Sequence, residues 1–323
     1  GIYMPMVPEI VIALLATAKI GGIILPLFSG FGPSAIAERL LDAEAKVLFT
    51  SDGMFIRGKS LHMKPTLDEA LREVQYAGVK HSDATSWLRA GALMSLWTVA
   101  SSTATVYQIF ADGCRETIRP LFGKLVGILV SDRAAVFGFW VMALRQVCHA
   151  HLLRKYVAFS ERDGPDGAIG RELLELTAVM FEYWHGFKEG LLTREELQFW
   201  MHPVQRDLER VLERGASTGE DGLSGSCANI LAHRDALWTF VTNEGVDPTN
   251  NHGELELRDF VLWRKRSFGS QSERGDRFAE RVMTIVRTAR KQGTDVLDFL
   301  VRSVSANVNG TPAPRLLAAS GRA

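Results

Sequence analysis

Three acidic residues stand at or near the ends of predicted elements, and together they could bind metal ions. Asp83 lies in the run H-S-D-A-T-S-W, Asp132 ends the apolar run I-L-V-S-D-R, and Glu254 lies in P-T-N-N-H-G-E-L-E-L-R. Hard divalent ions such as Mg²⁺ or Mn²⁺ prefer carboxylate oxygens, and two such ions can hold the attacking and leaving oxygens of a phosphoryl substitution. Taken singly, an aspartate after a strand caps a turn more often than it binds a metal. The interpretation therefore depends on the elements that bring the three together.

Four predicted strands determine where the two aspartates lie. Alternation and apolar runs predict strands at 79–87, 92–100 and 103–110, a helix at about 115–122, and a buried strand at 125–130. Three antiparallel strands, a helix and a buried strand are the opening of a ribonuclease-H-like fold. In such a sheet the first and fourth strands are neighbours, so Asp83 and Asp132 would meet although they are about fifty positions apart.

The rest of this part of the chain is predicted to be mainly helical. Helical periodicity covers 139–241, with breaks at 162–167 and 215–226, and further helices are predicted from about 250, at 274–292 and at 295–306. Asparagine is a good N-cap, so Asn250 or Asn251 marks the start of the helix that carries Glu254. Glu256 is the alternative ligand on that helix. The two glutamates are separated by about 200° around the helix axis, so both cannot face the same ions.

The first 74 residues have a different character. Here the pattern predicts a helix at 8–20, a short buried strand at 23–27, a helix at 34–42 and a strand at 46–50. The apolar run 7–27 is interrupted by charged residues, glycines and a proline, which indicates buried protein and not a membrane span. A lone segment of this kind is expected to cover its apolar faces poorly or to associate with another surface.

The wording of this segment resembles one enzyme family. The runs G-I-Y-M-P-M-V-P-E, A-K-I-G-G and D-A-E-A-K-V-L-F-T-S-D-G closely resemble an early stretch of acetyl-CoA synthetases, which belong to the acyl-adenylate-forming superfamily. The phosphate loop and the adenylate- and CoA-binding motifs of that family belong to later sequence that this chain lacks. We therefore expect no adenylating activity from the segment.

The remaining three quarters or so of the chain resembles a second family. The runs H-S-D-A-T-S-W, C-H-A-H-L-L-R, P-T-N-N and W-R-K-R-S-F-G-S-Q-S-E-R-G-D-R-F are similar to those of the insertion-sequence-66 transposases. The resemblance implies that Asp83, Asp132 and Glu254 are an Asp-Asp-Glu triad that binds Mg²⁺ or Mn²⁺ in a two-ion site. It further implies cleavage and strand transfer of double-stranded DNA, transposon ends and target, in the cytoplasm by a homo-oligomer with no membrane contact.

These patterns predict an α/β protein. The predicted fold is a ribonuclease-H-like mixed sheet with a long helical insertion, preceded by a β/α fragment of an adenylate-forming enzyme. The predicted domains are the synthetase-like fragment, the first part of the transposase core, the helical insertion, and the end of the core with C-terminal helices, at 1–74, 75–138, 139–243 and 244–323.

Basic residues gather directly after the Glu254 helix. Nine lysines or arginines and three acids lie within 264–291, although the net charge of the whole chain is zero. Such a run can contact a phosphate backbone without reading bases; a solvated loop is the alternative. The candidate DNA contacts are Arg264, Lys265, Arg266 and Arg274, together with His151 at the position that the family motif gives it.

The cysteines limit the other kinds of site. Cys114, Cys148 and Cys227 are far apart and form no C-x-x-C pair, which argues against a disulfide framework and is typical of a reducing cytoplasm. Cys148, His149 and His151 suggest zinc. Zinc needs about four ligands, however, and no paired cluster stands elsewhere, so we predict structural or DNA-proximal roles for them.

Two departures from the family wording support a competing hypothesis. Ala84 stands where the family commonly has glutamate, and Leu255 stands where it has arginine. Ala84 points away from the strand face that carries Asp83, whereas the missing arginine removes a phosphate or carboxylate contact. The second hypothesis is therefore an inactive, truncated transposase remnant fused to a synthetase fragment.

Overall fold

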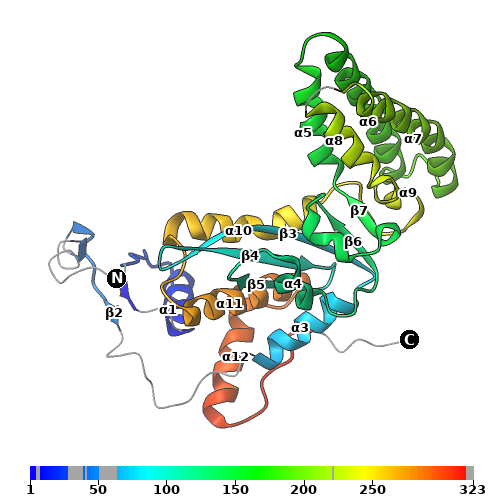
Figure 1. The fold of residues 1–323 in the computed structure, drawn as a ribbon. Helices are drawn as coiled ribbons and strands as arrows, with labels where there is room; N and C mark the ends of the chain where they lie inside the picture. Colours follow the sequence, from blue (N-terminus) through cyan, green and yellow to red (C-terminus); the bar gives the residue numbers. More distant parts are fainter. Residues whose placement is uncertain (5–7, 28–38, 41, 51–63, 220–221, 318–323) are drawn as a thin grey trace.

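A mixed five-stranded sheet forms the centre of the molecule (Figure 1). The computed structural model describes residues 1–4, 8–27, 39–40, 42–50, 64–219 and 222–317. The central strands are β3 (Val79–Arg89), β4 (Ala92–Ala100), β5 (Thr105–Phe110), β6 (Ile128–Ser131) and β7 (Arg145–Val147). Their spatial order is β5-β4-β3-β6-β7, with β3, β4 and β5 antiparallel and with β6 parallel to both β3 and β7. The chain is therefore an α/β protein with a mixed sheet.

The structure confirms the four predicted strands and adds a fifth. β6 begins three residues later than predicted because Leu125 and Gly127 have positive φ angles, which extended strands do not tolerate. β7 was not predicted. It is three residues long and carries the polar side chains of Arg145 and Gln146, both of which are buried. The helical stretch predicted from residue 139 begins as an α-helix only at His149, so that prediction is wrong for 139–148.

Helices cover both faces of the sheet. On one face α10 (Asn251–Ser267) lies across β3 and β4, and α11 (Glu273–Lys291) joins the same core along β5. On the other face α3 (Lys64–Tyr76) and α4 (Arg115–Ile118) pack with the turn η1 (Arg119–Phe122). The remaining short turns are η2 (Ala135–Phe139), η3 (Met142–Leu144) and η4 (Arg234–Ala236). The two faces follow from the alternation of β4, in which Leu96 belongs to the first core and Trp97 to the second.

Helix α11 closes the exposed edge of the sheet. β5 is an outer strand, so alternate backbone N–H groups point away from its only partner strand. Side chains spaced four residues apart on α11 accept hydrogen bonds from these groups. Glu280, Thr284 and Thr288 accept from the N–H groups of Ile109 at 2.7 Å, Tyr107 at 3.2 Å and Thr105 at 3.0 Å, respectively. The helix therefore replaces a missing strand.

This edge closure predicts the effect of one substitution. Thr284→Val keeps the shape of the side chain but leaves the buried N–H of Tyr107 without its acceptor. An unsatisfied buried donor costs about 1–3 kcal/mol. Urea unfolding of the variant should therefore show a loss of about 2 kcal/mol, and Thr284→Ser, which keeps the hydroxyl, should lose less than the valine variant. Equal losses in the two variants would show that the hydroxyl does not serve the edge.

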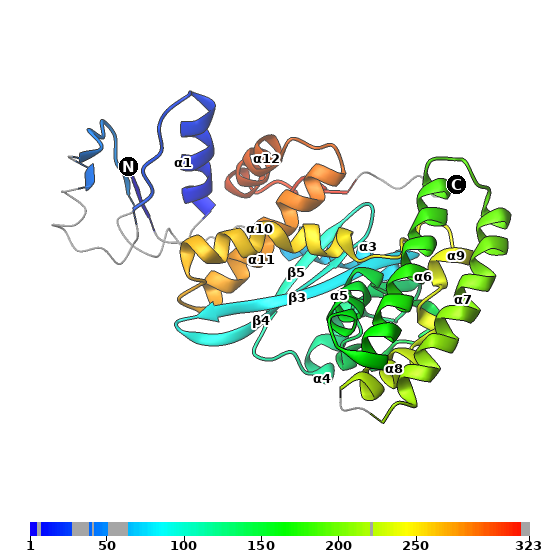
Figure 2. The same ribbon diagram turned by 90° about the horizontal axis from the view of Figure 1, so that it is seen from above.

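The helical insertion forms a lobe beside the β6–β7 end of the sheet, as both ribbon views show (Figures 1 and 2). Its helices are α5 (His149–Ser160), α6 (Gly164–Lys188), α7 (Arg194–Ala216), α8 (Leu223–Leu231) and the short α9 (Thr239–Thr242). The two predicted breaks fall between α5 and α6 and between α7 and α8. Gly170 on α6 allows close contact with α5, since a Cβ there would lie 2.2 Å from the backbone nitrogen of Ser160.

The N-terminal segment only partly matches its predicted elements. α1 (Pro8–Lys19) forms as predicted, and β1 (Ile2–Tyr3) pairs in parallel with β2 (Phe49–Thr50), which is shorter than the predicted strand at 46–50. The strand predicted at 23–27 is reduced to a single bridge at Pro26. The helix predicted at 34–42 falls mostly outside the described residues.

The prediction that this segment covers its apolar faces poorly is confirmed. One side of α1 packs through Ile10, Val11 and Leu15 against the core that α11 shares with α12 (Val296–Asn309). Beyond it, Ile20 is 84% exposed and Ile23 is 97% exposed. The expectation that the run 7–27 is buried is therefore wrong for its outer part. None of the described helices combines the length and the apolar character that a membrane crossing requires.

Candidate active site

Three adjacent parallel strands bring distant residues to one end of the sheet. β3 pairs with β6 through His81 and Val130, so the same register continued by two residues places Asp83 level with Asp132. β6 pairs with β7 through Ser131 and Val147, and the next step places Cys148 level with Asp132. Neighbouring strands lie about 4.8 Å apart. The predicted meeting of the two aspartates is thus built into the strand register.

Asp83 occupies a buried and negatively charged position. Its side chain lies on the same face of β3 as Trp87, which packs edge-on against Phe260 of α10. Burial is the main cause that raises the pKa of Asp83, and the carboxylates of Asp132 and Glu254 add to it, while the hydrogen bond from the N–H of Ala84 lowers it. The net pKa is about 6. The charges of both other predicted acids therefore act on Asp83 at this end of the sheet.

Two hydrogen bonds fix the backbone around Asp132. The Asp132 carboxylate accepts a hydrogen bond from the N–H of Ala134 at 3.0 Å, which closes the turn after β6. The buried guanidinium of Arg145 on β7 donates to the carbonyl oxygen of Asp132 at 3.0 Å. Arg145 was not predicted as a site residue, and its role here is to position Asp132.

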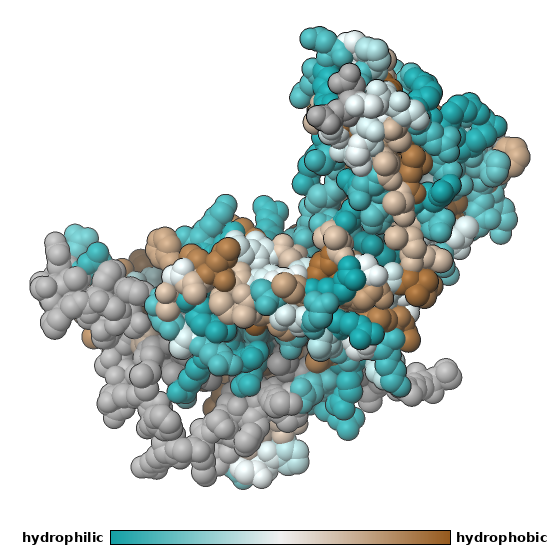
Figure 3. Space-filling model, viewed as in Figure 1, coloured by the Kyte–Doolittle hydropathy of each residue, from teal (hydrophilic) through white to brown (hydrophobic). Residues whose placement is uncertain are grey.

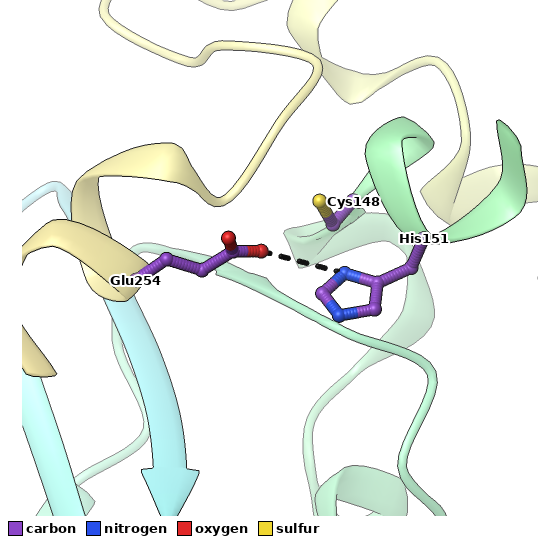
Figure 4. Close-up of side chains that lie close together, drawn as sticks. All are labelled: Cys148, His151 and Glu254. Atoms are coloured by element: carbon purple, nitrogen blue, oxygen red, sulfur yellow. Dashed lines mark ion pairs between the residues drawn. The ribbon is translucent and has the colours of Figure 1, made fainter. Parts of the chain in front are cut away.

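Glu254 reaches the same region from the first turn of α10. Its Oε1 lies 3.7 Å from Nδ1 of His151 and 3.9 Å from a guanidinium nitrogen of Arg154, both on α5 (Figure 4). Among the residues that the structure describes, the one group of three or more ligand atoms close enough to hold a single ion is Cys148, His151 and Glu254. The three carboxylates do not form such a group. A two-ion site does not require all three carboxylates to surround a single ion, because two of the acids can bind each ion.

The alternative ligand Glu256 has a different position. It is buried, and its carboxylate pairs with Arg287 at 2.8 Å and with Lys291 at 3.1 Å, both on α11. Thr105 of β5 also donates to it at 3.0 Å. Glu256 therefore ties α10 to α11, and Glu254 is the glutamate of this helix whose charge acts on Asp83.

Comparison with known proteins identifies the larger part of the chain. The model of the family described as "Transposase IS66 family" matches residues 50–277, more than two thirds of the chain. The chain belongs to the IS66 transposase family. The resemblance predicted from about residue 79 onward is therefore confirmed, and the match begins further upstream than predicted.

The beginning of this IS66-family chain is similar to different enzymes. It is 54% identical over 73 residues to an acetyl-coenzyme A synthetase of Rhodopirellula baltica, and these residues are 23% of this chain and 11% of the relative. It is 53% identical over 70 residues to a 3-hydroxypropionyl-coenzyme A synthetase of Sulfurisphaera tokodaii, covering 22% of this chain and 11% of the relative. The chain thus spans about a tenth of the length of the curated relatives that it matches.

Asn250, predicted only as an N-cap, holds the start of α10 to the sheet of this IS66-family core. Its side chain caps no helix N–H; it donates to the carbonyl oxygen of Ser82 at 2.9 Å and lies 3.2 Å from Nδ1 of His81. The predicted start of the helix is confirmed, with Asn250 at the N-cap position, although its side chain bonds to β3 and not to the helix. The backbone N–H of Asn250 donates to the Cys148 sulfur at 3.1 Å. One residue thus joins β3, α10 and the end of β7.

The two histidines of the C-H-A-H run point in different directions. His149 is fully buried between Trp238 and Phe240, and burial lowers its pKa to about 4. His151 is half-buried and faces Glu254, and the neighbouring Cys148 thiol raises its pKa against the effect of burial. Only His151 belongs to the site.

The last turn of α10 carries the predicted DNA contacts Arg264, Lys265 and Arg266, and Arg264 is engaged within the protein. Arg274 lies in the first turn of α11. The Arg264 guanidinium donates to the hydroxyls of Thr85 at 3.1 Å and Ser86 at 2.5 Å, which fixes α10 on β3. Lys265, Arg266 and Arg274 are exposed. The eleven steps from Glu254 to Lys265 span about 16 Å along the helix axis. The basic end of α10 is therefore separate from the acids but lies on the same helix as Glu254.

Proposed function

We propose that this IS66-family protein is a DNA transposase of the Asp-Asp-Glu type, in which Asp83, Asp132 and Glu254 hold two divalent ions. The observation that carries the proposal is the strand register, which sets Asp83 level with Asp132, together with the start of α10, which brings Glu254 to face them. The strand order β5-β4-β3-β6-β7, with the first three strands antiparallel, supports a ribonuclease-H-like core. Double-stranded DNA is the substrate, and a homo-oligomer acts on paired ends.

The donor set fits hard divalent ions. Three carboxylates offer oxygen ligands of the kind that Mg²⁺ and Mn²⁺ prefer. The pKa of Asp83 is raised chiefly by burial and further by the neighbouring carboxylates, and a bound cation would offset both effects. The bound ions would supply activation of the attacking oxygen and stabilisation of the leaving oxygen in phosphodiester cleavage and strand transfer.

The other residues of the site position these acids. Arg145 fixes the carbonyl of Asp132, Asn250 fixes the start of α10, and Arg264 fixes the far end of the same helix against β3. Fixing the ligands before the substrate arrives lowers the entropic cost of reaching the reactive geometry. A cytoplasmic location is proposed because it suits a DNA substrate and three free cysteines.

The two positions that differ from the family motif, Ala84 and Leu255, leave the three acidic residues in place. Ala84 packs in the core on the opposite side of the sheet from Trp87 and α10, so its side chain points away from the site as predicted. Leu255 is 54% exposed beside Glu254, where an arginine could have contacted a phosphate. The family match does not favour an inactive remnant over a transposase, and we expect a working metal site with weakened DNA contact at residue 255.

Metal binding tests the proposal directly. A Mn²⁺ titration followed by the electron paramagnetic resonance of free Mn²⁺ should show up to two bound ions per folded chain. Asp132→Asn should weaken the binding at least about 100-fold, because it removes a negatively charged ligand. Asp298→Asn, an exposed aspartate on α12, is the matched control and should bind as the parent does. A folded parent that binds no Mn²⁺ would contradict the proposal.

The basic end of α10 should determine the salt dependence of DNA binding. Each phosphate contact contributes about 0.9 to the slope of log K against log salt. The double variant Lys265→Ala with Arg266→Ala should therefore reduce the slope by about 2 on double-stranded oligonucleotides of any sequence, measured by fluorescence anisotropy. Arg210→Ala on α7, an exposed arginine in the helical lobe, should leave it unchanged. An unchanged slope in the double variant would place the DNA elsewhere.

A further inference from the structure

We propose that Cys148, His151 and Glu254 form a second kind of metal site, one that takes Zn²⁺. The site shares Glu254 with the proposed Asp-Asp-Glu centre but does not depend on catalysis there. Sequence reasoning set zinc aside because Cys148 and His151 lie on one helix without a second Cys or His cluster. The fold supplies the missing ligand from α10, about a hundred residues further along the chain.

The three ligand atoms converge from the beginnings of two helices (Figure 4). Cys148 immediately precedes α5, and His151, three residues on, lies on the same side of its first turn. Glu254 extends toward them from the first turn of α10. The sulfur, the imidazole nitrogen and a carboxylate oxygen all lie within 4.8 Å of one another. Ligand atoms in a tetrahedral zinc site are roughly 3.3–3.7 Å apart, given bonds of about 2.0–2.3 Å. The 3.7 Å between His151 and Glu254 already matches.

Two of these atoms are buried without a hydrogen bond. Nδ1 of His151 and Oε1 of Glu254 are inaccessible to solvent, and neither has a hydrogen-bond partner among the described residues. They face each other at 3.7 Å, which is too long for a hydrogen bond. Buried polar atoms are rarely left unpaired in native proteins, and each one calls for an explanation. A cation between them satisfies both atoms at once.

The sulfur of Cys148 is held in a fixed position at the start of α5. The side chain is fully buried, and its sulfur accepts a hydrogen bond from the backbone N–H of Asn250 at 3.1 Å. It also lies at the N-terminus of the twelve-residue α5, where the helix dipole stabilises negative charge.

The donor types separate this site from the carboxylate centre. Sulfur and imidazole nitrogen are preferred by Zn²⁺, whereas Mg²⁺ takes oxygen ligands. One thiolate, one carboxylate and a neutral imidazole balance the charge of Zn²⁺ and leave a fourth position for water. Zn²⁺ bound here holds Glu254 on the α5 side. It therefore withdraws this carboxylate from ions at Asp83 and Asp132, and zinc should oppose Mn²⁺-dependent activity.

Cobalt substitution tests the site without any assay of activity. Co²⁺ added to the reduced, full-length chain should bind with a thiolate-to-cobalt charge-transfer band and with the intense visible bands of tetrahedral cobalt. Equimolar Zn²⁺ should abolish both. Cys148→Ser should lose the charge-transfer band and bind Zn²⁺ at least about 100-fold more weakly, and Glu254→Gln, at a half-exposed position, should weaken binding in the same direction. Cys114→Ser, which changes an exposed cysteine, is the matched control and should keep the spectrum.

Each outcome decides the proposal. No thiolate band in the folded parent, a band retained in Cys148→Ser, or a band lost in Cys114→Ser would overturn it. If Cys148→Ser fails to fold, as judged by circular dichroism, the Glu254→Gln variant and X-ray absorption of the zinc-loaded parent decide, since the parent must show one sulfur ligand. Asp83→Asn should bind Co²⁺ as the parent does. A cobalt spectrum that survives this change while Mn²⁺ binding is lost distinguishes the zinc site from the Asp-Asp-Glu centre.

Discussion

Asp83→Asn should reduce Mn²⁺-dependent DNA cleavage by about 10³-fold or more and should also stabilise the metal-free fold. The loss of activity follows because metal ions contribute several kcal/mol to a phosphoryl transition state, and each 1.36 kcal/mol corresponds to a factor of ten. The gain in stability follows because Asp83 is a buried carboxyl. Burial, together with the neighbouring carboxylates, raises its pKa to about 6. A substitution that lowers activity and raises stability indicates a residue that is retained for function.

The pH dependence of folding stability determines whether Asp83→Asn stabilises or destabilises the chain. The pKa of Asp83 is higher in the folded chain than the ordinary value of 3.8, so the folded state holds the proton more tightly than the unfolded state. Stability from this group is present below pH 4 and is lost as the pH rises toward 6. Asparagine does not ionise, so the Asp83→Asn variant does not lose stability as the pH rises. The variant should therefore be about 2 kcal/mol more stable than the parent at pH 7.5 and similar to it at pH 4.

Urea unfolding in the presence of EDTA measures this difference. Asp298→Asn is the control, because this exposed aspartate makes only a surface ion pair with Arg302 and should change stability by less than about 1 kcal/mol at either pH. An Asp83→Asn variant that is less stable than the parent at pH 7.5 would show that the carboxylate is satisfied within the protein and is not kept for a metal.

Of the substitutions described, Glu256→Ala should cause the largest loss of folding stability. Its carboxylate is buried and pairs with Arg287 and Lys291, while Thr105 donates to it. Removing one partner of a buried ion pair leaves the other charges uncompensated and costs about 3–5 kcal/mol. Thermal or urea unfolding should therefore show a loss of about 3 kcal/mol or more, and the contact between α10 and α11 should loosen.

Glu254→Ala is the matched comparison, since it changes the same residue type two positions away. Glu254 is half-exposed, and its nearest charged groups lie 3.7 and 3.9 Å away. We expect a stability change of less than about 1 kcal/mol together with loss of Mn²⁺-dependent activity. A reversal, with Glu254→Ala unfolding the chain and Glu256→Ala abolishing activity in a stable protein, would exchange the roles assigned to the two glutamates.

Much of the sheet was predictable because its strands carry clear patterns. β3, β4 and β5 alternate between two cores, and the turn Ala90-Gly91 and the short loop Ser101-Ser102 mark their ends. Asp132 could be placed at a strand end because an apolar run precedes it. The neighbouring position of Asp83 required knowledge of the strand order, which came from the succession of three antiparallel strands, a helix and a buried strand and not from the pattern of either strand alone.

The parts that were missed depend on tertiary contacts. β7 has only three residues, and its buried Arg145 and Gln146 resemble a polar loop. Without β7, nothing in the sequence places Cys148 beside Asp132, so the nearness of Glu254 to Cys148 and His151 could not be foreseen. The contacts of Arg264 with Thr85 and Ser86, far away in sequence, were equally invisible.

The central claim is that Asp83, Asp132 and Glu254 bind divalent ions for DNA strand transfer, and one measurement tests it most directly. Nicking and joining of labelled double-stranded oligonucleotides should be followed with Mn²⁺ for the parent and Asp132→Asn, with both proteins shown to be folded. We predict cleaved and joined products for the parent and at least about 10³-fold less for the variant. Equal activity in the two proteins, or a folded parent that binds Mn²⁺ and DNA and never cuts, would contradict the account.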